Sequence, residues 1–301
     1  MVSVGNSSRL GLGTAQFGSE YGISNSKGRV PEGDIVSILD FAKNSNIGLL
    51  DTASLYGDSE AILGKLLPAD HSFRIVTKTP VAKDAIIDQA HCLDVERALY
   101  RSLDHLSQKS VYGLLVHDCN DLFKPGGDLL LTTLQEACRS GLVEKIGVSV
   151  YDGTQIDTVL EKFTPDIIQL PFSIADQRLV VSGHLKKLHA HGVEIHARSI
   201  FLQGALLMDP QLLPQHFDSV RSYFINFGLA AKKAGLSRLQ ACVQFVLAHQ
   251  EIDIALVGVT AIAELAEIVA ASSVAGGMAY DAPELALNDE RYIVPMNWTA
   301  K

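Results

Sequence analysis

Residues 113–149 read GLLVHDCNDLFKPGGDLLLTTLQEACRSGLVEKIGVS, and the order of the patterns in this stretch decides the fold. Two short apolar runs, 113–117 (GLLVH) and 145–149 (KIGVS), are typical of buried parallel strands. Between them, 130–141 (LLTTLQEACRSG) has the amphipathic spacing of a helix, and its closing glycine is typical of a helix C-terminus. The stretch therefore predicts a strand, a helix and a second, parallel strand.

The same alternation extends along most of the chain. Six further strands are expected at 10–13, 48–51, 73–78, 166–170, 194–198 and 255–258, with helical patterns such as 35–44 (IVSILDFAKN) between them. Pro31 stands at the expected first turn of that helix. Eight strands, each followed by a helix, predict a closed (β/α)8 TIM barrel and a single domain over residues 1–301. An open doubly wound sheet is the alternative. It is less favoured, because 11–18 (GLGTAQFG) lacks the third glycine of a dinucleotide fingerprint and opens no obvious helix.

Composition and charge exclude several classes of protein. The 301 residues are 47% hydrophobic, enough for a large core, and the formal net charge of −9 gives no electrostatic attraction to nucleic acid or an anionic membrane. No apolar run of about 18 residues predicts a membrane span, and the N-terminus does not resemble a secretory signal. The four cysteines form no CxxC pair, so we expect reduced thiols and a cytoplasmic location.

Polar residues at consecutive strand ends indicate a site. In a (β/α)8 barrel, catalytic residues lie at the C-terminal ends of the strands and in the loops that follow. Asp51 and Lys78 end the second and third strands, His117 ends the fourth, and the loop 51–60 (DTASLYGDSE) supplies Tyr56. Each residue taken singly has a structural explanation: a helix cap, a rim aromatic, a solvated lysine or a loop histidine. Taken together at neighbouring strand ends, they predict one catalytic cluster.

These four residue types suit proton transfer to an oxygen atom. A phenol, whose ordinary pKa is about 10, is a poor acid at neutral pH, and a nearby ammonium lowers that pKa by favouring the phenolate. A carboxylate beside the ammonium keeps it charged and oriented. A neutral imidazole can then hydrogen-bond the substrate oxygen, so the cluster predicts a general acid for a developing oxyanion.

Seven segments resemble successive signatures of the aldo-keto reductases: 10–18 (LGLGTAQFG), 51–60, 76–79 (VTKT), 114–118 (LLVHD), 146–152 (IGVSVYD), 167–173 (IIQLPFS) and 197–206 (ARSIFLQGAL). The resemblance extends from about residue 10 to about residue 269. It implies an oxidoreductase that moves a hydride between a nicotinamide cofactor and a carbonyl or alcohol. By this resemblance Tyr56 is the acid/base, Lys78 tunes it, Asp51 pairs with Lys78, and His117 orients the carbonyl.

The resemblance also implies a set of cofactor contacts. Ser149 and Gln169 match residues that bond the nicotinamide carboxamide, although Val150 stands where the family often has Asn. Arg198 replaces an aromatic that stacks on the nicotinamide, and a guanidinium plane can also stack. The segment 199–206 resembles the loop over the pyrophosphate, and 258–265 resembles a phosphate site at a helix start. The implied cofactor-binding residues are Gly13, Thr14, Ser149, Gln169, Arg198, Ser199, Phe201, Gln203, Gly204, Gly258 and Thr260.

The choice between the two nicotinamide cofactors rests on conflicting signals. The family usually takes NADP(H), whose 2′-phosphate commonly meets Lys or Arg. No basic residue occurs between Gly258 and Ser272, and Glu264 and Glu267 are acidic. We therefore expect NADP(H), with NAD(H) close behind, and only modest discrimination between them. The expected substrate is a small carbonyl compound or alcohol, with sugars among the candidates.

Two other functions remain open on sequence alone. A barrel lyase or aldolase could use Lys78 as a Schiff-base nucleophile, and a non-catalytic regulatory subunit would need no turnover.

His189, His191 and His196 lie close together in the sequence, as the ligands of a metal site often do. However, the first two point apart on a helix, so no metal site is expected.

Overall fold

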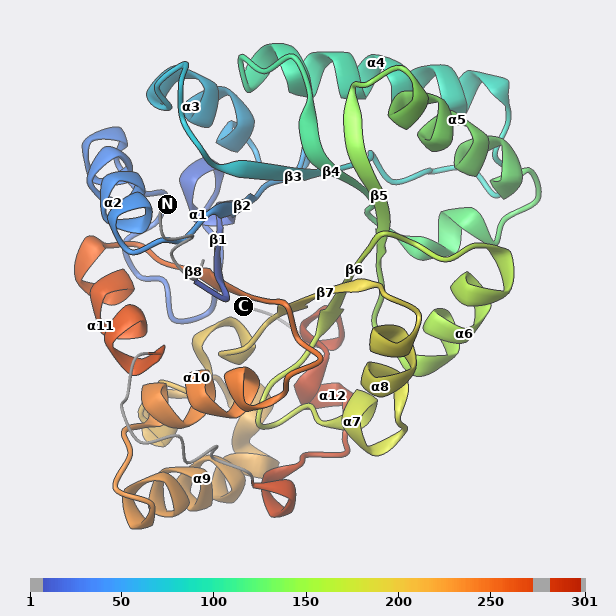
Figure 1. Ribbon diagram of the computed structural model, residues 1–301. Coiled ribbons are helices and arrows are strands. Elements are labelled where there is room, and N and C mark those ends of the chain that lie inside the picture. Colours follow the sequence, from blue (N-terminus) through green and yellow to red (C-terminus); the bar gives the residue numbers. More distant parts are fainter. Residues whose placement is uncertain (1–7, 273–281, 299–301) are drawn as a thin grey trace, which may run out of the picture.

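A closed parallel β-barrel forms the centre of the computed structural model, which describes residues 8–272 and 282–298 (Figure 1). The strands follow one another round the barrel in chain order, and β1 closes it by pairing with β8. The predicted (β/α)8 barrel is confirmed. Its strands are β1 (Leu10–Gly13), β2 (Leu49–Asp51), β3 (Arg74–Lys78), β4 (Val111–Val116), β5 (Val143–Ser149), β6 (Ile167–Pro171), β7 (Glu194–Arg198) and β8 (Ile254–Gly258).

β1 and β7 have the predicted limits, and the limits of the other six strands differ from the predicted ones by one or two residues. β4 and β5 each begin two residues earlier than expected, because the pairing of Val111 with Val143 extends both strands to the N-terminal side of the predicted runs. His117 lies one residue beyond the end of β4.

The segment 11–18 does contain one helical turn, α1 (Ala15–Gly18), where no helix was expected. The turn is too short to show a periodic pattern. Pro31 caps the following helix instead of lying within its first turn.

Helices surround the barrel (Figure 1). The chain between β7 and β8 contributes two of the longer ones. The longer helices are α2 (Glu32–Asn44), α3 (Ser59–Leu66), α4 (Gln89–His105), α5 (Gly127–Arg139), α6 (Gly153–Lys162), α8 (His184–Ala190), α9 (Arg221–Lys233), α10 (Arg238–Ala248) and α11 (Ile262–Ser272). Single α-helical turns are α7 (Arg178–Val181) and α12 (Glu290–Ile293). The 3-10 helices are η1 (Cys119–Leu122), η2 (Leu202–Gly204), η3 (Pro210–Leu212), η4 (Gln215–Val220), η5 (Pro283–Leu285) and η6 (Pro295–Asn297).

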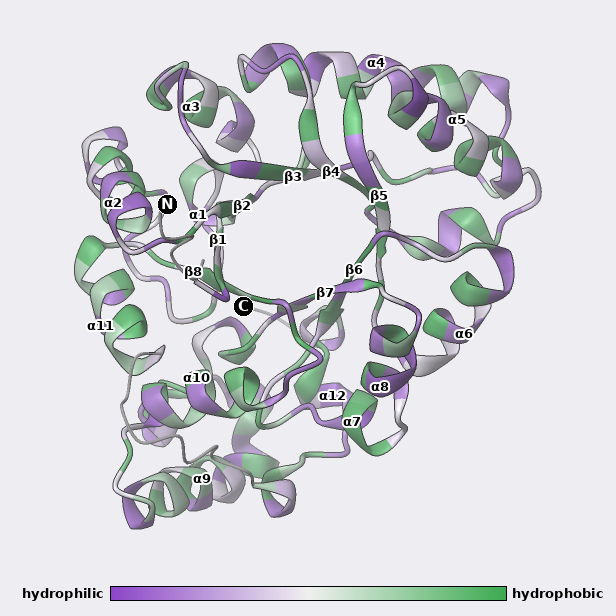
Figure 2. Ribbon diagram, in the orientation of Figure 1, coloured by the Kyte–Doolittle hydropathy of each residue, from purple (hydrophilic) through white to green (hydrophobic). Residues whose placement is uncertain are grey.

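Two apolar layers hold the barrel together. The larger lies between strands and helices, and Figure 2 shows hydrophobic and hydrophilic residues on different faces of the outer helices. The smaller fills the barrel interior with Leu49, Val76, Tyr112, Leu115, Ile167, Ile254 and Leu256. The apolar helix α11 packs against both α2 and α10, as its composition predicts. Within the described residues there is no helix of the length and apolarity that crossing a membrane requires.

A polar cluster surrounds the first residue of β7. The carboxylate of Glu194 accepts hydrogen bonds from the Tyr112 hydroxyl (2.5 Å), the Lys145 ammonium (2.6 Å) and Nε2 of His196 (2.9 Å). Burial alone would raise the pKa of Glu194, but these bonds lower it to about 2. His196 is therefore part of a structural network, while His189 is exposed on α8. No potential metal-binding group of three or more His, Cys, Asp or Glu occurs in residues 8–272 and 282–298.

Candidate active site

The four residues singled out at the strand ends meet at the wall of one cavity of about 870 Å³. Asp51 and Lys78 are the last residues of β2 and β3, and His117 directly follows β4. Tyr56 reaches the same cavity from the loop between β2 and α3. The parallel strands bring these side chains together, because their C-terminal ends all lie at one mouth of the barrel.

Asp51 and Lys78 form the predicted ion pair. The Lys78 ammonium donates to Oδ1 and Oδ2 of Asp51, both at 2.8 Å, and to the carbonyl oxygen of Thr52 at 2.9 Å. The two side chains are only 1% and 6% exposed. Burial alone would lower the pKa of Lys78, but Asp51 and Tyr56 together raise it above its ordinary value. The amine therefore stays charged although it is buried.

Tyr56 stands between this ammonium and His117. The Lys78 Nζ lies 5.0 Å from the centre of the Tyr56 ring, and the His117 ring meets that ring edge-on at 6.2 Å. Burial, reinforced by the positive charge of Lys78, lowers the pKa of His117 to about 4. Nδ1 of His117 is buried without a hydrogen-bond partner. A phenol and a neutral imidazole thus face the same space at neutral pH.

Two glycines allow the Tyr56 loop to pack against α1. A Cβ on Gly18 would lie 1.8 Å from the carbonyl oxygen of Tyr56, so no larger residue fits there without movement. Gly57 has φ of +57°, and a Cβ on it would lie 2.3 Å from the carbonyl oxygen of Gly18. The hydroxyl of Ser59 adds a hydrogen bond to Oγ1 of Thr14 at 2.8 Å. The backbone that carries Tyr56 is therefore held close against α1.

All the residues named for cofactor binding also line this cavity. Ser149 and Gln169 are register partners on β5 and β6. The amide nitrogen of Gln169 donates to Oδ1 of Asp51 at 2.7 Å, which leaves the amide oxygen available to another donor. Arg198 donates to the carbonyl oxygen of Val150 at 3.0 Å, and its guanidinium carbon lies 4.3 Å from the centre of the Tyr151 ring. The guanidinium plane is thereby held in one orientation.

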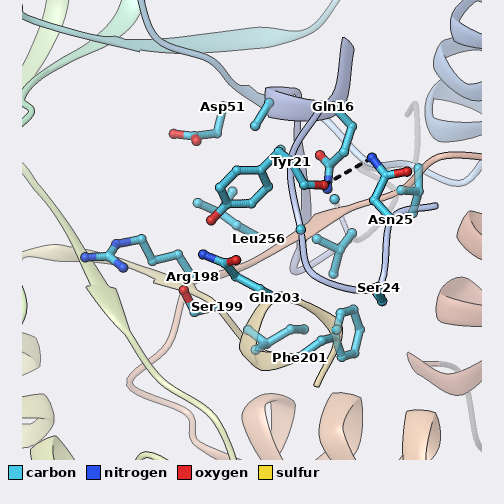
Figure 3. A pocket seen from close by; sticks show the side chains of 18 of the residues that line it. Gln16, Tyr21, Ser24, Asn25, Asp51, Arg198, Ser199, Phe201, Gln203 and Leu256 are labelled. Atoms are coloured by element: carbon cyan, nitrogen blue, oxygen red, sulfur yellow. Dashed lines mark hydrogen bonds between the residues drawn. The ribbon is translucent and has the colours of Figure 1, made fainter. Parts of the chain in front are cut away.

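The loops after β1 and β7 meet beside the cavity. Figure 3 shows Tyr21 from the first loop pointing towards Gln203 from the second, while the Asn25 amide nitrogen donates to the Tyr21 carbonyl oxygen. A Cβ on Gly204 would lie 1.9 Å from Oγ of Ser24, so the two loops are in close contact. The backbone of the second loop is left-handed at Ser199, Leu202 and Gln203, a conformation that clusters at functional sites.

Sequence reasoning missed part of the cavity wall. It did not assign Gln16, Tyr21, Ser24, Asn25, Tyr151, Arg238, Pro295 and Met296 to the site. The strand-end rule could have found Tyr21 and Tyr151, since both follow barrel strands. Pro295 and Met296 had no such signal, because only the fold of the chain after α11 brings them to the cavity.

The residues present fit a nicotinamide dinucleotide. One continuous cavity joins the catalytic cluster to Gly258 and Thr260, just before the start of α11. The amide oxygen of Gln169 and the hydroxyl of Ser149 can meet a carboxamide, and the backbone at the helix start can meet a phosphate.

Comparison with known proteins agrees with this geometry. The model of the aldo/keto reductase family matches residues 9–276. The chain belongs to the aldo/keto reductase family. A search of curated protein sequences finds no match.

Solved structures of bacterial aldo-keto reductases share the fold. The holo form of an aldo-keto reductase from Bacillus halodurans has a TM-score of 0.72 and 20% identity, with 89% of this chain and 87% of that chain covered. The glycerol dehydrogenase from Gluconobacter oxydans has a TM-score of 0.67 and 22% identity, with 87% and 85% covered. An aldo-keto reductase-type protein from Pseudomonas aeruginosa has a TM-score of 0.66 and 23% identity, with 89% and 90% covered.

Proposed function

We propose that this aldo-keto reductase interconverts a carbonyl compound and an alcohol with a nicotinamide cofactor, and that Tyr56 is its general acid/base. The observation that carries the proposal is the buried Asp51–Lys78 ion pair beneath the Tyr56 ring, next to a neutral His117. A charged ammonium beside a phenol stabilises the phenolate, so it assists proton release at the moment when an oxyanion forms.

Each residue of the cluster has one role in the proposed reaction. The hydride for the carbonyl carbon would come from the reduced nicotinamide when that cofactor is bound. Tyr56 gives its proton to the carbonyl oxygen, and His117 hydrogen-bonds the same oxygen. Lys78 stabilises the phenolate left behind, and Asp51 keeps Lys78 charged and in place.

The cofactor would be held along the length of the cavity. Ser149 and Gln169 would bond the carboxamide, and Arg198 would pack against the nicotinamide ring with the face that Tyr151 does not cover. The loop with Ser199, Phe201, Gln203 and Gly204 would lie over the pyrophosphate, with Gly13, Thr14, Gly258 and Thr260 completing the wall. NADP(H) is the cofactor that the family usually takes, NAD(H) is the alternative, and the residues at the end of the cavity away from the catalytic cluster bear on the choice between them.

The substrate is proposed to be a small carbonyl compound or alcohol. Gln16, Tyr21 and Gln203 give the cavity polar side chains that can bond hydroxyl groups, which is compatible with a sugar. A cytoplasmic location is part of the proposal, because all four cysteines are free thiols.

The Schiff-base alternative is disfavoured by the state of Lys78. A nucleophilic lysine needs a neutral, accessible amine, and such residues have a lowered pKa. Lys78 has a raised pKa, is 1% exposed on its side chain, and donates to Asp51 and Thr52. The amine is therefore poorly placed for attack on a carbonyl carbon.

Turnover of 4-nitrobenzaldehyde with NADPH and with NADH tests the proposal. We expect activity with at least one cofactor, and Tyr56→Phe should lower kcat by about 10²–10⁴-fold, the usual contribution of a general acid. The dissociation constant of the reduced cofactor should change little. Tyr100→Phe, at an exposed position on α4, is the matched control and should behave like the parent.

The outcomes separate the three functions. Cofactor binding without any turnover of aldehydes, ketoses or alcohols would favour a regulatory subunit. Turnover that survives in Tyr56→Phe would remove Tyr56 from the mechanism. A covalent adduct trapped on Lys78 by borohydride in the presence of substrate would favour the lyase.

A further inference from the structure

Two acidic side chains line the end of the cavity that lies away from the catalytic cluster, here called the far end. Glu264 and Glu267 lie one turn apart on α11, and both line the cavity together with Thr260. The nicotinamide would lie beside the catalytic cluster at the barrel mouth. The far end of the cavity would therefore meet the adenosine part of the dinucleotide. The inference drawn from it rests on the proposed function.

The carboxylate of Glu264 is held at the start of the helix. It accepts a hydrogen bond from the backbone N–H of Thr260 at 2.7 Å and from the Thr260 hydroxyl at 2.9 Å. The positive end of the helix dipole favours a negative group at this point. The Thr260 N–H and hydroxyl, two donors that could receive a phosphate at the helix start, are thus already bonded to an anion of the protein itself.

Positive charge that could offset these carboxylates is limited. Among the described residues lining the cavity, the formal cations are Lys78, Arg198 and Arg238. Lys78 is paired with Asp51 at the barrel mouth, and Arg198 bonds the carbonyl oxygen of Val150.

Arg238 is the remaining cation. Its guanidinium donates to the carbonyl oxygens of Phe224 (2.8 Å) and Leu206 (3.4 Å) and packs against Gly228. It forms no ion pair with either glutamate in the described structure. Both terminal nitrogens of this guanidinium therefore donate to the protein backbone.

We infer that Glu264, supported by Glu267, makes this chain select NAD(H) over NADP(H). A ribose 2′-hydroxyl is a hydrogen-bond donor and suits a carboxylate acceptor. A 2′-phosphate is an anion that accepts hydrogen bonds, so it meets like charge and must displace Glu264 to reach the two donors of Thr260. The specificity comes from a repulsive element as well as an attractive one.

Dissociation constants of NADH and NADPH, measured by the fluorescence of the reduced nicotinamide on the native chain, test this selection. We expect NADH to bind at least about tenfold more tightly, equivalent to about 1.4 kcal/mol. The ratio should fall as the salt concentration rises, since the repulsion lies at an exposed site.

Glu264→Gln removes the charge and keeps a side chain that can still reach Thr260. In this variant the ratio of the NADPH to the NADH dissociation constant should fall at least about threefold, mainly because NADPH binds more tightly. Glu161→Gln removes an exposed carboxylate from α6, on the opposite side of the barrel in Figure 1, and should leave both constants unchanged.

Tighter binding of NADPH to the native chain, or an unchanged ratio in Glu264→Gln, would overturn the selection by Glu264 and leave the proposed function standing. Failure of the native chain to bind either cofactor would instead overturn the proposed function, and this inference with it.

Discussion

Individual residues at the barrel mouth act through one another. Asp51 bonds both Lys78 and Gln169, while Lys78 faces the ring of Tyr56. Removing the carboxylate leaves a buried ammonium without its counter-charge, which favours the neutral amine. The effect of Asp51 on catalysis is therefore expected to pass through Lys78.

The double-mutant cycle of Asp51→Asn and Lys78→Met measures this coupling. Each single variant should lower kcat strongly, and the double variant should lose about as much as the worse single one, because residues acting as a unit are not additive. The pH–rate profile of Asp51→Asn should also change shape. A loss in the double variant equal to the product of the two single losses would show that the residues act independently.

At the scale of elements, the contact between α1 and the Tyr56 loop sets the position of the acid. We predict that Gly18→Ala lowers the free energy of unfolding by about 1–3 kcal/mol, the usual cost of overpacking. It should also lower kcat at least about tenfold, since its Cβ would displace the Tyr56 backbone. Urea unfolding and aldehyde turnover check the two effects.

Gly33→Ala is the matched control on α2. A Cβ there meets open space, so alanine should raise the free energy of unfolding by about 0.4–1 kcal/mol and leave kcat unchanged. Parent-like turnover in Gly18→Ala would mean that the α1 contact does not position Tyr56.

The elements also show what the sequence could and could not predict. Apolar runs ending in Asp51 and Lys78 predicted the strands and their ion pair, because strand direction alone brings those side chains together. The bond from Thr260 to Glu264 depends on a side-chain conformation that charge patterning does not specify. The approach of Met296 to the cavity depends on packing of the tail, which no local pattern records.

At the scale of the whole molecule, titratable groups with shifted pKa values lie at both ends of the barrel. The Asp51–Lys78 pair and His117 lie at the C-terminal ends of the strands, and Glu194 lies with Lys145 near the N-terminal ends. Buried groups with shifted pKa values make stability depend on pH, because the folded and unfolded chains bind different numbers of protons. The pH dependence of unfolding therefore reports on both ends.

Two groups with strongly lowered pKa values contribute to this dependence on the acid side. The folded pKa of His117 is about 4, below its ordinary value of 6.5, so the unfolded chain binds more protons between these values. Stability is complete above pH 6.5 and falls towards pH 4 by up to about 3 kcal/mol from this residue. The folded pKa of Glu194 is about 2, below its ordinary 4.5, so its contribution is lost as pH falls from 4.5 towards 2.

Urea unfolding from pH 7 to pH 3 should thus show stability decreasing in two overlapping stages. His117→Asn should flatten the stage between pH 6.5 and pH 4, while its stability at pH 7 changes only by the packing difference. Glu194→Gln should flatten the stage below pH 4.5, at the cost of lower stability at pH 7, where three donors lose their anionic acceptor.

The control variant is His189→Asn, at an exposed position on α8, which should reproduce the parent profile. If His117→Asn keeps the full loss between pH 6.5 and pH 4, the histidine is not held neutral by burial, and its role as a neutral hydrogen-bonding partner of the substrate oxygen would have to be given up.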